Sequence, residues 1–290
     1  MKKYRIALVT SKDFPELTSG ENLLPHALCD LGHEVDMCIW DARDVVWQDY
    51  DAVVIRCPWD YHKKIAQFLA WLDWLAACQI NVINDIETLR WNLNKSYLFE
   101  LLQAGLPVIP TQLVALSDQR TLHEIFKAMH SKEIVIKPVQ SAGAWRTLRV
   151  NSNNLVDAEL SFNTWRREQD FLVQAFMPEV VIDGEWSLVY FDGQLSHALV
   201  KRAKEGDFRV QSDHGGTASR ADAPEHMCAQ ALKILKFLPR MPCYARVDGV
   251  VRGGAFLLME LELVEPQLFL DIEDQAAPRF AQAIISHLSK

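Results

Sequence analysis

Apolar and polar positions recur with two different periods over the first eighty residues. Short apolar runs rich in β-branched side chains have the length of buried strands, and they occupy residues 4–9, 35–40 and 52–55. Apolar side chains recur at helical spacing in residues 23–31 and 65–77. Strands that alternate with helices predict a parallel, doubly wound sheet of the α/β class.

Beyond residue 90 the pattern changes to pairs of strands with fewer helices between them. A helix over residues 95–103, capped by Asn94, precedes Gly105 and two prolines. Two-residue turns that contain glycine predict hairpins at Asp192 and Gly193 and at Gly253 and Gly254. The other expected elements are helices over residues 121–130, 155–166 and 223–238 and strands over residues 134–136, 147–150 and 171–176.

This change of pattern predicts two domains, residues 1–90 and residues 91–290. The second domain would contain a small lid subdomain at about residues 111–175. The chain has 290 residues, of which 49% are hydrophobic, and this is enough apolar surface for a large packed core.

Charge and cysteine usage exclude several classes of protein. The net charge is -8, and acidic residues are mixed with basic ones, so no basic surface for nucleic acid is expected. The six cysteines include no CxxC pair and read as free thiols of a reducing cytosol. No apolar stretch reaches the roughly 18 residues of a membrane span. We therefore expect a cytoplasmic protein that does not bind membranes.

The first candidate for chemistry is Lys137, which ends a buried strand just before a loop of small residues. Ser141, Ala142 and Gly143 would let backbone amides approach a phosphate, and Lys137 would supply the positive charge. A solvated lysine at a strand end is the alternative for this segment read alone.

Three carboxylates form the second candidate. Asp248, Glu260 and Glu262 lie on two adjacent, otherwise apolar strands. Residues two apart on a strand share a face, so Glu260 and Glu262 would point one way, while Met259 and Leu261 point into the core. Converging carboxylates resist ionisation unless they share a cation, and oxygen ligands suit Mg²⁺. A solvated acidic strand face is the alternative.

A loop with cations and glycines is the third candidate, and it suits an anionic group. Lys201, Lys204 and Arg209 precede Gly215 and Gly216. A flexible charged surface loop is the alternative here. The segment has no second histidine at zinc-ligand spacing, and the chain has neither a GxSxG nucleophile nor a GxGxxG turn after its first strand. Zinc chemistry and a NAD-dependent oxidoreductase are therefore disfavoured.

In their order along the chain, these segments resemble the ATP-grasp superfamily, in the branch that contains the ribosomal-protein glutamate ligase, prokaryotic glutathione synthetase, D-alanine:D-alanine ligase and the cycloserine-pathway ligase. The resemblance spans the whole chain. The motifs that carry it are NKSYLFELLQAGLPVIPT, VIKP with its small-residue loop, LVQAFMPEVVIDGEWS, KRAKEGDFR with HGG, and ARVDGVV with MELELVEP. The fold that it implies is an ATP-grasp fold, in which two α+β subdomains grip ATP, preceded by a doubly wound domain.

The resemblance implies a role for each matching residue. Lys95 and Lys137 would contact the ATP phosphates, and Ser141, Ala142 and Gly143 would form the loop that closes over them. The adenine hinge would be Gln174, Ala175, Phe176 and Met177, and Glu185 would hold the ribose. Two Mg²⁺ ions, for which Mn²⁺ could substitute, would bind Asp248, Glu260 and Glu262. Catalytic contacts would come from Arg246, Arg209 and Lys201, and substrate contacts from Gly215 and Gly216.

Two residues depart from the family pattern. Glu262 stands where relatives often have Asn, which adds negative charge to the metal site. Trp145 adds bulk to the small-residue loop, whose closure is then expected to differ.

The expected activity is an ATP-dependent C–N ligase that forms an amide through an acyl phosphate on an amino acid or small peptide. Glu21 and Arg56, which follow the first and third strands, are the substrate candidates, although Arg56 could equally form a structural salt bridge. The alternative function is a catalytically silent, ATP-binding regulatory protein of the same fold. The oligomeric state stays open, with a homodimer or a homotetramer as candidates.

Overall fold

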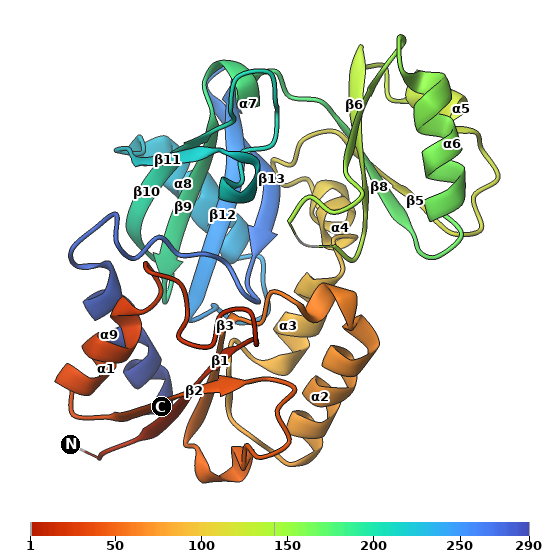
Figure 1. Cartoon of the computed structure of the whole chain (residues 1–290). Helices are drawn as coiled ribbons and strands as arrows, with labels where there is room; N and C mark the ends of the chain where they lie inside the picture. Colours follow the sequence, from red (N-terminus) through yellow and green to blue (C-terminus); the bar gives the residue numbers. More distant parts are fainter. Residues whose placement is uncertain (1, 142, 290) are drawn as a thin grey trace.

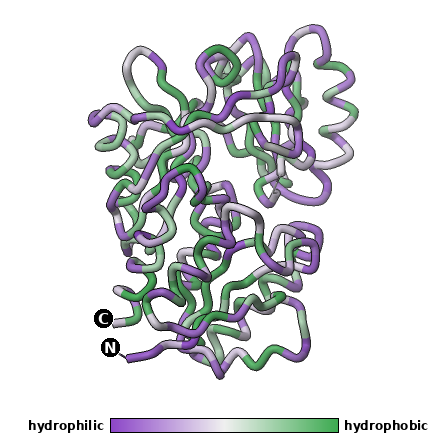
Figure 2. The backbone as a smooth tube through the Cα atoms, turned by 60° about the vertical axis from the view of Figure 1, so that its left-hand side comes forward, coloured by the Kyte–Doolittle hydropathy of each residue, from purple (hydrophilic) through white to green (hydrophobic). Residues whose placement is uncertain are grey.

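The structure is a computed structural model that describes residues 2–141 and 143–289 of the chain. Its strands form three sheets, and Figure 1 shows the N-terminal sheet below the other two. None of the helices in the described part of the chain combines the length and the apolar character needed to cross a bilayer. Figure 2 shows hydrophobic stretches alternating with hydrophilic ones along the backbone.

The N-terminal sheet has the strand order β2-β1-β3-β4, with every neighbouring pair parallel. Ile6 and Leu8 pack on one face with α1 and α9, whereas Ala7 and Val9 pack on the other with α2 and α3. The predicted doubly wound sheet is therefore confirmed. Its elements are β1 (Arg5–Thr10), α1 (Leu23–Asp30), β2 (Glu34–Ile39), β3 (Ala52–Cys57), α2 (Ile65–Ala77), β4 (Val82–Ile83), α3 (Ile86–Leu93) and, from the other end of the chain, α9 (Ala276–Leu288).

The central sheet is antiparallel and has the order β11-β10-β9-β12-β13. Both predicted hairpins are present, and all four turn residues have positive φ, as a two-residue turn of this kind requires. Apolar side chains of α8 share a core with this sheet. The elements here are α4 (Tyr97–Gln103), α7 (Glu179–Ile182), β9 (Glu185–Phe191), β10 (Gln194–Arg202), β11 (Thr217–Arg220), α8 (Glu225–Leu235), β12 (Tyr244–Arg252) and β13 (Ala255–Glu262).

The third sheet, which we call the lid sheet, is antiparallel and has the order β5-β8-β6-β7. Its core contains Ile134 and Ile136 together with apolar side chains of α5 and α6. Val135 and Lys137 alternate with them and so face away from these helices. The elements are β5 (Thr111–Val114), α5 (Leu122–Ala128), β6 (Glu133–Pro138), β7 (Leu148–Asn151), α6 (Leu155–Trp165) and β8 (Phe171–Ala175).

The start of α4 differs from the expectation, and the predicted domain boundary falls inside a helix. The helix expected from Lys95 begins at Tyr97, because the side chain of Asn94 accepts a hydrogen bond from the Ser96 amide, while the Lys95 amide donates to the Val139 carbonyl. The division between residues 1–90 and 91–290 would fall inside α3, and it stays a prediction.

Candidate active site

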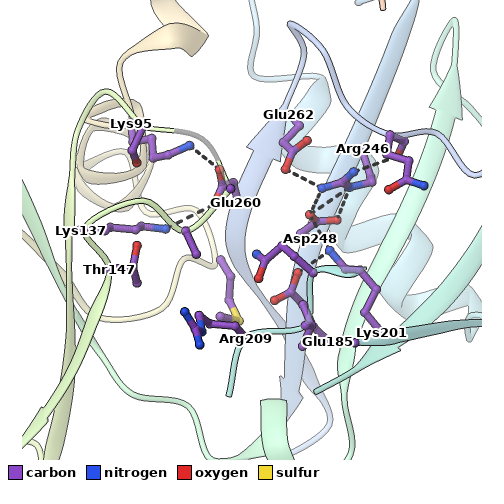
Figure 3. Close-up of a pocket in the computed structure, with 18 of the residues that line it drawn as sticks. Lys95, Lys137, Thr147, Glu185, Lys201, Arg209, Arg246, Asp248, Glu260 and Glu262 are labelled. Atoms are coloured by element: carbon purple, nitrogen blue, oxygen red, sulfur yellow. Dashed lines mark hydrogen bonds and ion pairs between the residues drawn. The ribbon is translucent and has the colours of Figure 1, made fainter. Parts of the chain in front are cut away.

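A cleft of about 690 Å³ lies where the three sheets meet. Side chains of β12 and β13 line it from the central sheet, and Val135 and Lys137 of β6 line it from the lid sheet. Phe14, Trp59 and Tyr61 come from loops that follow β1 and β3. Figure 3 shows charged side chains from the lid and central sheets reaching into the space between them.

Cross-strand register brings the predicted carboxylates together on the floor of the cleft. Asp248 pairs with Glu260, and Arg246 pairs with Glu262, so that four charged residues share one sheet face. Leu261 points into the core as predicted. Met259 is the extra residue of a β-bulge, because Gly249 pairs with Leu258. It lines the cleft and packs, partly buried, against a small apolar cluster rather than the main core under the sheet.

Glu260 joins the lid to the floor. Its two carboxylate oxygens contact the ammonium groups of Lys95, at 2.5 Å, and Lys137, at 3.4 Å. Burial alone would raise the pKa of Glu260, but the two lysines outweigh burial and lower it. Burial lowers the pKa of Lys137, and the neighbouring Lys95 adds to that effect against the attraction of Glu260. These two lysines thus converge on one carboxylate of the predicted metal set.

A second charge cluster lies beside the first on the same floor. Arg246 contacts Asp248 at 2.9 Å and Glu262 at 2.5 Å. Lys201 contacts Glu185 at 2.7 Å and Asp248 at 3.1 Å. Figure 3 shows this group on the central sheet, on the side away from Glu260, Lys95 and Lys137.

Negative charge in this cluster is only partly compensated. Burial would raise the pKa of Asp248, but Arg246 and Lys201 lower it. The pKa of Glu262 is raised to about 7, first by burial and then by Asp248 and Glu260, against the pull of Arg246. Burial also raises the pKa of Glu185. An additional cation would be stabilised here, and the oxygen donors suit Mg²⁺.

The predicted metal ligands are not arranged as a coordination site in this structure. Among the described residues there is no group of three or more His, Cys, Asp or Glu side chains arranged to hold a metal ion. Each carboxylate is held apart by a lysine or arginine, so metal binding at Asp248 and Glu260 would displace these ion pairs.

Most of the other residues that were predicted to bind the nucleotide also line the cleft. Ser141 and Gly143 do so, whereas Ala142 lies outside the described residues. The hinge segment lies at the end of β8, where the amides of Ala175 and Phe176 donate to backbone carbonyls of Pro110 and Glu133. The lining residues of the hinge are Gln174, Ala175, Phe176 and Met177.

Arg209 and the glycine pair are only partly placed as expected. Arg209 lines the cleft, but its guanidinium contacts Asp207 at 2.8 Å and is about a third exposed. Gly216 lines the cleft, whereas Gly215 is exposed and does not. A substrate contact from Gly215 in this arrangement is therefore not supported.

The prediction that Glu21 and Arg56 bind the substrate is wrong for this structure. Their side chains are 1% and 0% exposed and form a salt bridge of 2.8 Å with each other. The Arg56 guanidinium also donates to the Pro266 carbonyl at 2.7 Å, and the Leu268 amide donates to Glu21 at 2.7 Å. Of the two alternatives for Arg56, the structural salt bridge is the one present.

Sequence reasoning missed Glu265, which lines the cleft three residues after Glu262. The tyrosine hydroxyl of Tyr61 donates to its carboxylate at 2.6 Å. Strand β13 ends at Glu262, and Glu265 lies in the loop that follows it. The alternation of side chains along a strand therefore could not predict where the Glu265 side chain points.

Two family models and a curated relative match this chain. Residues 6–84 match the family described as D-cycloserine synthetase DcsG, N-terminal domain, and residues 100–241 match the prokaryotic glutathione synthetase ATP-grasp domain. The cycloserine biosynthesis protein DcsG of Streptomyces lavendulae is 32% identical over 299 residues, which cover 98% of each chain.

Solved structures give the same picture. The crystal structure of D-cycloserine synthetase DcsG superposes with a TM-score of 0.88 at 28% identity and covers 98% of this chain and 99% of that one. The D-alanine–D-alanine ligase of Bacillus anthracis, crystallised with ATP, superposes with a TM-score of 0.70 at 15% identity and covers 99% of this chain and 97% of that one. This second likeness concerns the fold.

Proposed function

Because this chain belongs to the ATP-grasp ligases and is an ATP-dependent ligase, we propose that it joins a carboxylate to an amine through an acyl phosphate, on an amino acid or a small peptide. The observation that carries the proposal is the convergence of Lys95 and Lys137 on Glu260, the cross-strand partner of Asp248. Lysines and carboxylates in this arrangement can hold a triphosphate together with divalent cations.

The residues divide into two groups by charge. Lys95 and Lys137 would turn from Glu260 to the phosphates, since an incoming metal ion takes their place at the carboxylate. Asp248, Glu260 and Glu262 would hold two Mg²⁺ ions, which when bound neutralise charge on the transferring phosphate. Glu185 and the hinge from Gln174 to Met177 would bind the nucleoside.

The substrate chemistry would take place beside Arg246. A substrate carboxylate would attack the γ-phosphorus of ATP, so that an acyl phosphate forms and ADP leaves. An amine would then attack the carbonyl carbon, lose a proton and release inorganic phosphate. The Arg246 guanidinium lies on the cleft floor, held by Asp248 and by the Gln267 carbonyl at 2.8 Å, and would stabilise the negative oxygen of the intermediate. Lys201 would hold Asp248 and Glu185 in position.

An ADP-release assay with ATP and Mg²⁺ tests the proposal against a panel of L- and D-amino acids and dipeptides. We expect release that depends on one panel member and is lost in Lys137→Ala. The matched control is Lys127→Ala, because Lys127 lies on α5 of the lid and does not line the cleft.

The second candidate function is a regulatory protein that binds ATP without turnover. Tight ATP binding without ADP release across the whole panel would favour it over ligation. The intact charge set of Lys137, Arg246, Asp248 and Glu260 favours a ligase, since buried charges are costly to keep without a use.

A further inference from the structure

One end of the cleft is aromatic and contains a single partly buried carboxylate. Phe14, Trp59, Tyr61 and Phe269 line this end, and the rings of Phe14 and Trp59 meet edge to face at 5.0 Å. Glu265 lies among them on the loop that follows β13. We call this group the aromatic end of the cleft.

The loop that carries Glu265 is held at three consecutive carbonyls. Trp59 donates to the Glu265 carbonyl at 3.0 Å, Arg56 to that of Pro266 at 2.7 Å, and Arg246 to that of Gln267 at 2.8 Å. The buried Arg56–Glu21 pair therefore supports this loop from below. Glu265 is thus fixed two residues from the point where Arg246 grips the chain.

Glu265 differs from the other partly buried carboxylates of the cleft in what surrounds it. Glu185, Asp248, Glu260 and Glu262 each contact a lysine or arginine, whereas within residues 2–141 and 143–289 no such ion pair reaches Glu265. Its hydrogen-bond donor is the neutral hydroxyl of Tyr61. Burial raises the pKa of this carboxyl, and the Tyr61 hydrogen bond and the charge of Lys95, which forms no ion pair with it, only partly offset burial.

We propose that Glu265 is the specificity residue that binds a primary ammonium group of the substrate at the aromatic end of the cleft. An ammonium would add a positive charge in direct contact and would donate to the carboxylate, while aromatic faces also attract cations. A divalent metal ion is better accommodated on the cleft floor, where Asp248, Glu260 and Glu262 share one face. The inference rests on the proposed ligase function and adds the residue that recognises the amine of the substrate.

Equilibrium binding tests this assignment without requiring turnover. The probes are the proteinogenic L-amino acids with D-alanine and D-serine, each beside its N-acetyl form, measured by calorimetry with Mg²⁺ and a non-hydrolysable ATP analogue. We expect the wild-type protein to bind at least one free amine about tenfold or more tightly than its N-acetyl form. Glu265→Gln should abolish that preference and leave binding of the ATP analogue unchanged.

Two variants separate recognition from folding. Asp13→Asn removes an exposed carboxylate that also lines the cleft, and it should keep the wild-type preference. Tyr61→Phe keeps the Glu265 carboxylate and should keep part of the preference for the free amine. This variant provides the test if Glu265→Gln fails to bind the ATP analogue.

Three outcomes would overturn the assignment: a wild-type protein that binds no free amine, one that binds N-acetyl forms equally well, or a Glu265→Gln variant with an undiminished preference. A preference for the free amine without any ADP release would instead reject the ligase function and leave the ammonium site standing.

Discussion

At the scale of single residues, Glu260 is the carboxylate that pairs with both Lys95 and Lys137. It contacts Lys95, which precedes α4, and Lys137 of the lid sheet, and it pairs across the strands with Asp248. Removing its charge leaves two lysines without a partner in the free protein and takes a ligand from the proposed metal set. Its loss should therefore affect ATP use more than stability.

Glu260→Gln is expected to lower kcat/KM for ADP release by on the order of 100-fold, because charge neutralisation at the transferred phosphate is lost. Steady-state kinetics with varied ATP and Mg²⁺ measure this. Glu273→Gln is the matched control, since Glu273 pairs with Arg220 and does not line the cleft. Equal losses in both variants would contradict the role of Glu260.

His197, which lies outside the two charge clusters, should make the stability of the free protein depend on pH. Its ring contacts the Leu268 carbonyl at 2.8 Å, and burial lowers its pKa below the ordinary 6.5. A histidine with a lowered folded pKa contributes stability above the unfolded pKa, and this stability is lost as pH falls through 6.5 toward the folded value. We expect the free energy of unfolding to fall between pH 7.5 and pH 5 less steeply in His197→Gln than in the wild type, measured by urea titration. An identical dependence of the unfolding free energy on pH in both proteins would show that protonation of His197 does not contribute to it.

At the scale of elements, the β12–β13 hairpin sets the floor of the cleft, and its bulge decides which side chains reach it. The register shifts between Asp248 and Gly249, so Glu260 stays opposite Asp248 while Met259 turns into the cleft. A Cβ on Gly249 would lie 2.3 Å from the Leu257 carbonyl oxygen and 2.6 Å from the Phe256 ring. The close approach of the strands at this point thus requires glycine.

Gly249→Ala should lower the free energy of unfolding by about 2 kcal/mol, because backbone atoms have to move. It should also reduce ATP affinity, because the shift begins next to Asp248. Denaturant unfolding and ATP titration measure the two effects. In Gly253→Ala the new methyl has open space, so only the positive φ costs about 1 kcal/mol and ATP affinity stays the same. Equal effects of the two substitutions on ATP affinity would argue against the bulge.

At the scale of the whole molecule, the two ends of the chain meet in one core. Helix α9 packs with α1 on the N-terminal sheet, and their apolar side chains share a cluster with Phe191 and Leu199 of the central sheet. The buried Glu21–Arg56 pair ties the N-terminal sheet to the loop after β13. The N-terminal sheet therefore acts on the cleft by supporting its floor.

Arg56→Met should lower the free energy of unfolding by about 3 to 5 kcal/mol, because Glu21 is left buried without a countercharge. The double variant Glu21→Gln with Arg56→Met should recover most of that loss. Denaturant unfolding of the wild type, both single variants and the double variant measures the coupling. Additive losses would contradict a structural pair.

Local pattern was enough to identify most elements and to select the site residues by type. Helix α2 runs over the expected residues 65–77, and both predicted hairpins are present, because glycine adopts the positive φ of such turns without steric strain. Period-two alternation put Glu260 and Glu262 on one face without knowledge of the neighbouring strand. The short strand β4 was not predicted, because two residues are too few to show a period. Helix α9 was not predicted either, although its apolar residues recur at helical spacing.

The sequence by itself determined the class of fold, the strand that carries each carboxylate and the chemical types of the cleft residues, because these follow from local spacing and side-chain chemistry. Only the tertiary structure decided which charges meet. It paired Glu21 with Arg56 in the core, turned Met259 into the cleft through a bulge, and placed the Glu265 carboxylate against the Tyr61 hydroxyl. Burial and long-range contact set these outcomes, and neither is encoded in the neighbours of a residue along the chain.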